Sequence, residues 1–154
     1  MKIADFLRKE NCVPALASDN KEEALKELCA LLVKNGDVKD SDAIYEAVID
    51  RERLGSTGIG DHVAIPHAKS NNVDSLVAAF GVSQKGIDYH AVDDKPVRII
   101  FLLLASENAT GSHLKALARI SRLLKNEKFR KDIEKVKSQD EIYNLILKEN
   151  DNGK

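Results

Sequence analysis

The chain has 154 residues, of which 43% are hydrophobic and 32% charged, and its formal net charge is −1. This length is enough for one well-buried core but short for two ordinary domains, and a nucleic-acid partner is not expected because such a surface usually carries a basic excess. No apolar run approaches the roughly 18 residues of a membrane span, and residues 1–12 lack the apolar core of a signal peptide. The sequence therefore predicts a cytoplasmic protein without direct membrane insertion.

The N-terminal part predicts a short helix, an edge strand and a longer helix. Apolar residues at 3, 6 and 7 favour the opening helix, and residues 12–16 favour a strand at a sheet edge, because Pro14 cannot donate to a ladder. Asp19 and Glu22 have capping-box spacing. Apolar side chains then repeat at helical intervals as far as Gly36, which is typical of a helix end; they are Leu25, Leu28, Cys29 and Leu32.

A second helix is predicted to begin at Asp40 or Ser41 and to carry Arg51 to its end, with Ile44 and Val48 on its inner face. Strands are expected at residues 63–65, ending at Pro66, and at 75–83. The run at 96–105 is apolar almost throughout, which is typical of a central strand covered on both faces. Residues 88–94 are expected to form a polar connection.

The C-terminal third predicts three helices. The first has His113 in its first turn and an apolar stripe of Leu114, Leu117, Ala118, Ser121 and Leu124. Residues 133 and 136 mark the second, and Ser138 with Glu141 forms a capping box for the third. We expect a frayed tail at 150–154. Together the elements predict a single three-layer α/β/α domain over residues 1–149, with a mixed central sheet flanked by helices.

His67 is the first candidate for chemistry. It follows an expected strand and Pro66, and proline pushes the residue before it into an extended conformation. The imidazole is thus expected just beyond a strand end, where α/β folds tend to place their sites. A phosphoryl-accepting nucleophile and a structural histidine both fit this position on the residues alone.

The glycine-rich segment 55–60 precedes this histidine. Its backbone N–H groups could form an anion-binding nest, with the hydroxyls of Ser56 and Thr57 as further donors around Gly58. A tight turn that joins a helix to a strand explains the glycines equally simply. The segment is neither a P-loop nor a dinucleotide-binding loop, so nucleotide binding gains no support.

Two further residues could act on an anion. His113 is expected at a helix N-terminus, where the helix dipole favours a neutral imidazole, although a capping histidine fits too. Arg51 offers a planar fork of donors, although a surface ion pair with an acid is the simpler alternative. His62 and His90 are expected at the surface. The two cysteines, Cys12 and Cys29, have no metal-type spacing, and a buried inert thiol is expected at position 29.

The motifs RE at 51–52, LGSTGIG at 54–60 and AIPHA at 64–68, followed by HL at 113–114, closely resemble the type-2 IIA domains of the bacterial phosphoenolpyruvate-dependent sugar phosphotransferase system. This is the fructose, mannitol and nitrogen-regulatory IIA family, and the resemblance extends across essentially the whole chain. One departure is His62, where the family commonly has glycine. The difference affects the expected pocket rim and leaves His67 in place.

The resemblance implies that His67 receives phosphate from the phosphohistidine of HPr or of an HPr-like carrier of the nitrogen branch. His113 and Arg51 would help to bind the phosphoryl group, while Ser56, Thr57 and Gly58 would shape the pocket. No metal or cofactor is required. The surface around His67 must admit another protein, so an apolar collar is expected around it.

Three outcomes remain open. In the first, the phosphate passes to a cysteine of a IIB domain during sugar uptake. In the second, the chain is a nitrogen-type regulator whose phosphorylation state alters its binding to other proteins. In the third, the chain is a binding module that is never phosphorylated. Retention of Arg51, His67 and His113 argues against the third. Neither cysteine of this chain has a IIB-like loop, so the chain would supply the IIA step alone.

Overall fold

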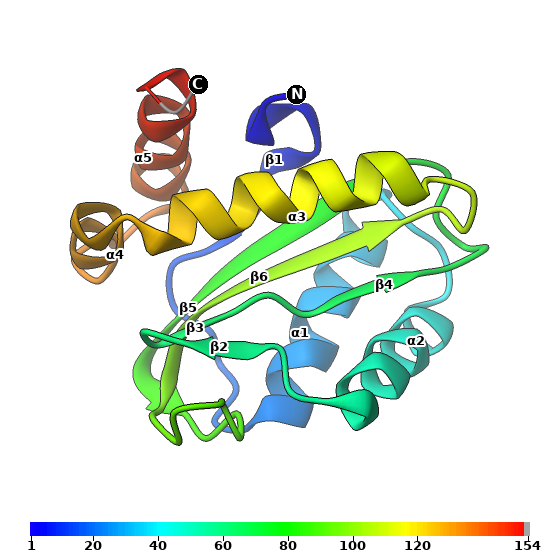
Figure 1. The fold of residues 1–154 in the computed structure, drawn as a ribbon, viewed down its shortest axis with the longest axis horizontal. Coiled ribbons are helices and arrows are strands. Elements are labelled where there is room, and N and C mark those ends of the chain that lie inside the picture. Colours follow the sequence, from blue (N-terminus) through cyan, green and yellow to red (C-terminus); the bar gives the residue numbers. More distant parts are fainter. Residues whose placement is uncertain (153–154) are drawn as a thin grey trace.

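A six-stranded mixed sheet forms the centre of the molecule, and helices cover both of its faces (Figure 1). The computed structural model describes residues 1–152, with side chains as far as residue 149. The elements are η1 (Ile3–Asp5), β1 (Leu7–Val13), α1 (Lys21–Lys34), α2 (Ser41–Leu54), β2 (Gly58–Gly60), β3 (Val63–Ala64), β4 (His67–Lys69), β5 (Val77–Ile87), β6 (Val97–Ala105), α3 (Thr110–Lys125), α4 (Glu127–Ile133) and α5 (Gln139–Asn152).

Strand β6 is the centre of the sheet, as its apolar sequence predicts. It runs antiparallel to β5 on one side and parallel to β3 and β4 on the other. Strand β3 pairs with the first half of β6 and β4 with the second half, so the two short strands lie one after the other along the same edge of β6. Pro66 separates them. The edge strand β1 is parallel to β5.

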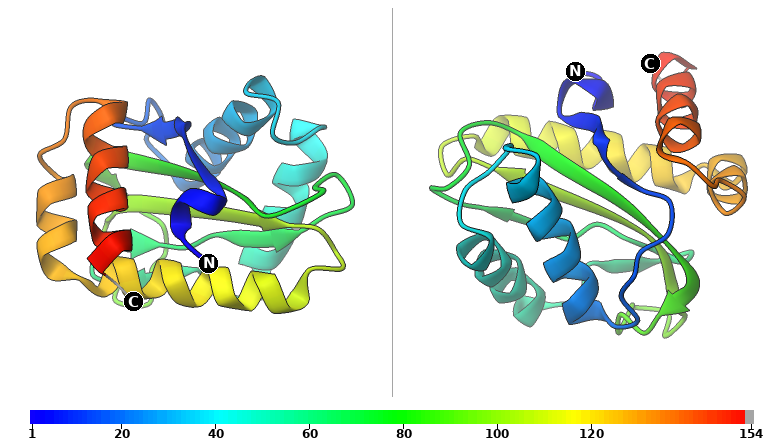
Figure 2. Two further views of the ribbon diagram at one scale, coloured as in Figure 1. Left: turned by 90° about the horizontal axis from the view of Figure 1, so that it is seen from above. Right: turned by 180° about the vertical axis from the view of Figure 1, so that it is seen from behind.

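The two faces of the sheet carry separate apolar cores. Helices α1 and α2 cover one face, while α3, α4, α5 and η1 pack on the other, and the views from above and behind place the strands between these layers (Figure 2). On the α3 side, the rings of Phe80 and Phe101 pack edge to face, with their centroids 5.4 Å apart. The prediction of a three-layer α/β/α domain with a mixed sheet is confirmed.

The N-terminal predictions need two corrections. The opening helix is only a 3₁₀ turn, and Leu7 already begins β1, which ends at Val13 before the proline. Helix α1 is capped by Asn20 and not by Asp19: the Asn20 backbone is extended, and its side chain accepts a hydrogen bond from the Glu23 N–H at 2.9 Å. The predicted edge position of β1 and the Asp40 cap of α2 are both confirmed.

The predicted inner face of α3 is confirmed at Leu124 but wrong in the first turn of the helix, next to the site. The helix is turned so that its buried residues are His113, Ala116, Ile120, Leu123 and Leu124. Leu114, expected in the core, is 62% exposed, and Leu117 is only half-buried. The helix thus directs His113 inward, leaves Leu114 at the surface and keeps Leu117 partly buried against the core.

At the C-terminal end, α4 stops at Ile133, before Val136, and the predicted Ser138 cap of α5 is formed by a hydrogen bond from the Glu141 N–H to the Ser138 hydroxyl at 3.1 Å. Helix α5 continues as far as Asn152 into the segment for which a frayed tail was expected, and residues 153–154 lie outside the described part. No helix within residues 1–152 combines the length and the apolar character needed to cross a membrane.

Candidate active site

The backbone around Pro66 fixes the position and tautomer of His67. The Pro66 carbonyl accepts a hydrogen bond from the Leu103 N–H of β6 at 2.9 Å, which places His67 at the start of β4. The His67 Nδ1 atom lies 2.8 Å from the Ile65 carbonyl oxygen. Because a carbonyl can only accept, Nδ1 is the protonated nitrogen and Nε2 carries the free lone pair. Burial, followed by the charge of Arg51, lowers the pKa of His67 below its usual value.

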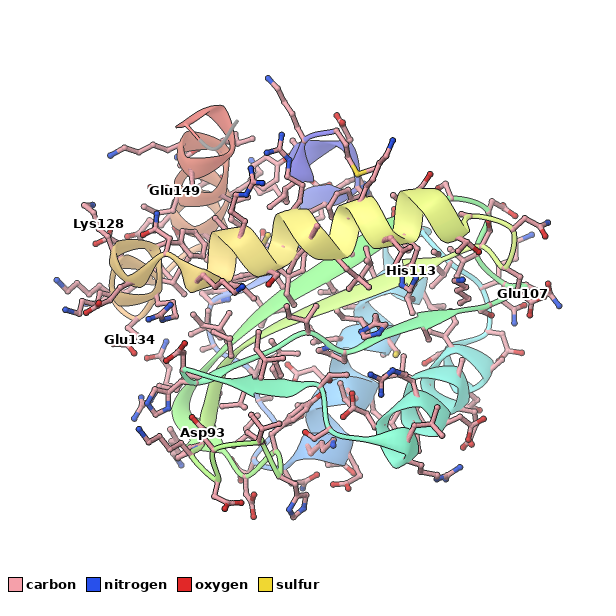
Figure 3. The ribbon with its side chains drawn as sticks, viewed as in Figure 1. Asp93, Glu107, His113, Lys128, Glu134 and Glu149 are labelled. Atoms are coloured by element: carbon pink, nitrogen blue, oxygen red, sulfur yellow. The ribbon has the colours of Figure 1, made fainter. Side chains whose placement is uncertain are left out.

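His113 faces His67 from the first turn of α3. The two ring centroids are 5.5 Å apart and their planes are inclined at 55°, and Figure 3 shows the His113 ring pointing from α3 toward β4. The residue is only 7% exposed, and its Nε2 atom is buried with no hydrogen-bond partner among the described residues. Burial is the main cause that lowers the pKa of His113, followed by the charges of His67 and Lys69. Both shifts favour the neutral form of the imidazole.

Arg51 completes the group that the sequence predicts. It comes from the last turn of α2 and donates from Nη1 to the Gly55 carbonyl oxygen at 2.9 Å. An open cavity of about 390 Å³ brings these three residues together; its lining comprises Ala47, Arg51, His67, Ala68, Lys69, His113, Leu114 and Leu117. Three chain segments that are far apart in sequence thus meet at one opening.

The apolar residues of this lining are candidates for the apolar collar that the sequence predicts around His67. Ala47 contributes from α2, while Leu114 and Leu117 contribute from α3. They lie on the two helices that border the histidine pair. The orientation of α3 therefore contributes to the collar, because it exposes Leu114 and leaves Leu117 only partly buried.

The glycine-rich turn lies outside the lining of the cavity. Ser56, Thr57 and Gly58 are not among the residues that line the cavity. The Ser56 hydroxyl donates to the Tyr89 carbonyl oxygen and accepts from the Gly58 N–H. A Cβ atom at Gly58 would come within 2.8 Å of Ala91, so only glycine lets the turn approach the loop behind it. These contacts join the turn to the loop after β5, and its role in shaping the pocket stays a prediction.

Thr57 belongs to a buried network centred on Glu52. The Thr57 N–H donates to Glu52 Oε1 at 3.1 Å, and the Thr57 hydroxyl makes a short hydrogen bond to Glu52 Oε2 and lies 3.0 Å from the Tyr89 hydroxyl. Lys21, from the start of α1, pairs with Glu52 at 2.8 Å, and its ammonium group lies 4.4 Å from the centre of the Tyr89 ring. The network fixes the end of α2 that carries Arg51.

Sequence reasoning missed Lys21 and Tyr89. Residues 88–94 were expected to be a polar connection, yet Tyr89 is fully buried. The one signal for these partners in the sequence was Glu52 in the motif beside Arg51. Glu52 is buried in the structure, and a buried acid needs a partner. Nothing in the sequence pairs it with a lysine 31 positions earlier.

The other histidines lie outside this cavity. His62 has a positive φ of 65°, and its Nδ1 atom lies 2.7 Å from the Pro96 carbonyl oxygen. His90 is exposed, with Asp88 at 3.7 Å. Both cysteines are buried, and burial raises the pKa of each thiol to about 12. Among the described residues, no group of His, Cys, Asp and Glu side chains is arranged to hold a metal ion.

Comparison with known proteins shows the family of the chain. The sequence model of the family described as phosphoenolpyruvate-dependent sugar phosphotransferase system, EIIA 2, matches residues 5–149. The chain is 40% identical over 146 residues to the fructose-specific EIIABC component of Bacillus subtilis, covering 95% of this chain but only 23% of that protein. It is 37% identical over 146 residues to the nitrogen regulatory protein of Bradyrhizobium diazoefficiens, covering 95% of both.

A solved structure gives the same result. The nitrogen regulatory protein IIA-Ntr of Neisseria meningitidis superimposes with a TM-score of 0.87 at 31% identity, covering 94% of this chain and 98% of that one. Relatives named for fructose transport and for nitrogen regulation are thus both present. The chain belongs to the type-2 EIIA family of the phosphoenolpyruvate-dependent sugar phosphotransferase system.

Proposed function

We propose that the chain is a phosphoryl carrier that accepts phosphate on Nε2 of His67 from the phosphohistidine of HPr or of an HPr-like carrier of the nitrogen branch. The observation that carries this proposal is the contact of His67 Nδ1 with the Ile65 carbonyl oxygen, at 2.8 Å. It leaves the lone pair of Nε2 as the nucleophile. The lowered pKa of His67 keeps that lone pair available at neutral pH.

The transfer is an in-line displacement between two imidazoles. The Nε2 lone pair of His67 attacks the phosphorus while the P–N bond of the donor breaks, and the donor imidazole keeps that electron pair. Donor and product are both phosphohistidines, so the step is close to balanced and reversible. The protein supplies positioning and charge stabilisation.

Arg51 and His113 have complementary roles in that step. The Arg51 guanidinium carries a permanent positive charge and a fork of donors suited to phosphoryl oxygens. His113 is neutral, so its protonated ring nitrogen donates a hydrogen bond without repelling the attacking imidazole. The unpartnered Nε2 of His113 supports the assignment, because a buried polar atom without a partner is costly unless a ligand satisfies it.

The next acceptor separates two forms of this function. In a sugar-uptake relay, phosphate passes from His67 to a cysteine of a IIB domain of the fructose or mannitol type, and the likeness to the B. subtilis fructose component supports this form. In a free-standing nitrogen-type regulator, the phosphorylation state controls binding to other proteins. The 37% identity with the B. diazoefficiens nitrogen regulatory protein supports this second form. A binding module that is never phosphorylated would leave the neutral histidine pair without a purpose.

One assay tests the carrier function and separates its forms. The chain is incubated with phosphoenolpyruvate, enzyme I and either HPr or a nitrogen-branch carrier, and the labelled protein is then offered to candidate IIB domains. One acid-labile phosphate on the chain is the expected result. Passage to a IIB cysteine supports the relay, while label that is accepted but not passed to any IIB domain supports the regulator. No label from either carrier would overturn the proposal.

A further inference from the structure

Lys69 reaches the phosphoryl cavity from the strand that carries His67. Side chains two residues apart on a strand point to the same face, so Lys69 follows His67 on one side of β4. It lines the cavity together with Arg51 and both histidines. Its Nζ atom donates to the Thr110 hydroxyl, at the first residue of α3, at 3.0 Å. Among the described residues, the hydrogen-bond partner of this ammonium group is thus a neutral hydroxyl.

The two cations of the cavity act on different histidines. The positive charge of Arg51 lowers the pKa of His67, whereas that of Lys69 lowers the pKa of His113. Arg51 and Lys69 line the same cavity as the two rings, whose centroids are 5.5 Å apart. A phosphoryl group on His67 Nε2 in this cavity would have both cations in its surroundings.

The first turn of α3 reaches the cavity through His113 and Leu114, while the hydroxyl of Thr110 holds Lys69. The Nε2 atom of His113 is buried and has no hydrogen-bond partner among the described residues, which independently points to a polar ligand at this place.

We infer that Lys69 is a further catalytic residue, which binds the phosphoryl group together with Arg51. This inference rests on the proposed phosphorylation of His67. In the unphosphorylated protein, Thr110 holds the Lys69 ammonium group in place. When the phosphoryl group arrives, Nζ exchanges the neutral hydroxyl for an anionic oxygen, which is the stronger hydrogen-bond acceptor. The positive charge is then greatest where negative charge develops during transfer.

A small-molecule donor tests this role without a partner surface. Phosphoramidate transfers its phosphoryl group to an imidazole as the P–N bond breaks and ammonia leaves, so a lysine that only touches the carrier protein has no effect on it. We expect Lys69→Gln to slow the labelling of His67 by about tenfold, the size of one charge-assisted hydrogen bond. Lys69→Arg should restore most of the rate, since it keeps the charge. Lys115→Gln removes an exposed lysine of α3 that does not line the cavity, and is the matched control.

A second measurement is independent of transfer. NMR follows the histidine rings during a pH titration. Lys69→Gln should raise the pKa of His113, because the charge of Lys69 is among the causes that lower it. Lys115→Gln should leave the pKa of His113 unchanged.

The outcomes separate this inference from the proposed function. Wild-type labelling together with an unchanged phosphoramidate rate in Lys69→Gln would overturn the role of Lys69 alone, even if the reaction with the carrier became slower. A wild-type protein that takes no phosphate from either donor would overturn the proposed function, and the role of Lys69 with it.

Discussion

The Nδ1 atom of His67 lies 2.8 Å from the carbonyl oxygen of Ile65, two residues earlier in the chain. Pro66 between them restricts the geometry, because its ring fixes its own φ and limits the backbone of Ile65 before it. The consequence is chemical: one ring nitrogen is occupied as a donor, and the other faces the cavity with its lone pair.

The position of the phosphate on the ring follows from this contact. We expect phosphorylated protein to carry the phosphoryl group on Nε2 of His67, because attack from Nδ1 would require loss of the hydrogen bond to Ile65. Nitrogen-15 NMR of the labelled imidazole distinguishes the two isomers. Phosphate found on Nδ1 would show that the ring rotates before it reacts.

A pH dependence of stability follows from the two lowered pKa values. Burial holds the pKa of both His67 and His113 below the unfolded value of about 6.5. The unfolded chain therefore binds more protons in the window just below that value, and the free energy of unfolding should fall as the pH falls through it. His113→Gln should flatten this dependence in urea denaturation at several pH values, while the exposed His90 replaced by Gln should not.

The role of His113 in transfer can be measured directly. We expect His113→Ala to accept phosphate on His67 but to transfer it roughly a hundredfold more slowly, the usual cost of removing one preorganised donor. Single-turnover kinetics with the cognate carrier provides the rate. An unchanged rate would remove His113 from the site.

The buried ion pair of Lys21 with Glu52, the residue after Arg51, should stabilise the fold. Glu52→Gln leaves the Lys21 ammonium group buried without a counter-charge and should cost about 3 kcal/mol in the free energy of unfolding. The double variant Lys21→Met with Glu52→Gln should recover part of the loss, because no charge then stays buried. Glu46→Gln, at an exposed position of the same helix, is the control in chemical denaturation. Equal stabilities of Glu52→Gln and the control would contradict the network.

The apolar collar predicts an effect on partner binding. Leu114 is 62% exposed beside His113, and its replacement by Asn should lower kcat/KM for the carrier by roughly five- to tenfold, as expected for an interface anchor. The phosphoramidate rate should change much less, because that donor has no protein surface. Val92→Asn, at another exposed aliphatic residue outside the cavity lining, tests whether exposure alone matters. The same loss in both variants would contradict a docking role for the collar.

The sequence predicted the parts of this molecule that local patterns specify. The apolar run of β6, the cap at Asp40 and the proline before His67 each constrain their own neighbourhood, and the structure agrees with them. The rotation of α3 was missed because two stripes have helical spacing there. One contains Leu114 and Leu117; the other contains Ala116, Ile120 and, unexpectedly, His113. Counting histidine as polar selects the wrong stripe.

Long-range pairs explain the remaining errors. Lys21 and Tyr89 meet Glu52 only because α1, α2 and the loop after β5 come together at one end of the sheet. Lys69 was overlooked for a related reason: its partner Thr110 is 41 positions away, and a lysine at a strand end is ordinary in sequence. Periodicity and capping patterns contain no information about either contact.

The central claim is that His67 is the phosphoryl acceptor, and intact-protein mass spectrometry after incubation with phosphoenolpyruvate, enzyme I and a cognate carrier tests it most directly. Wild-type protein and His90→Ala should each gain the mass of one phosphoryl group that acid removes, and His67→Ala should gain none. An acid-labile phosphoryl group on His67→Ala, with the fold of that variant intact, would contradict the account.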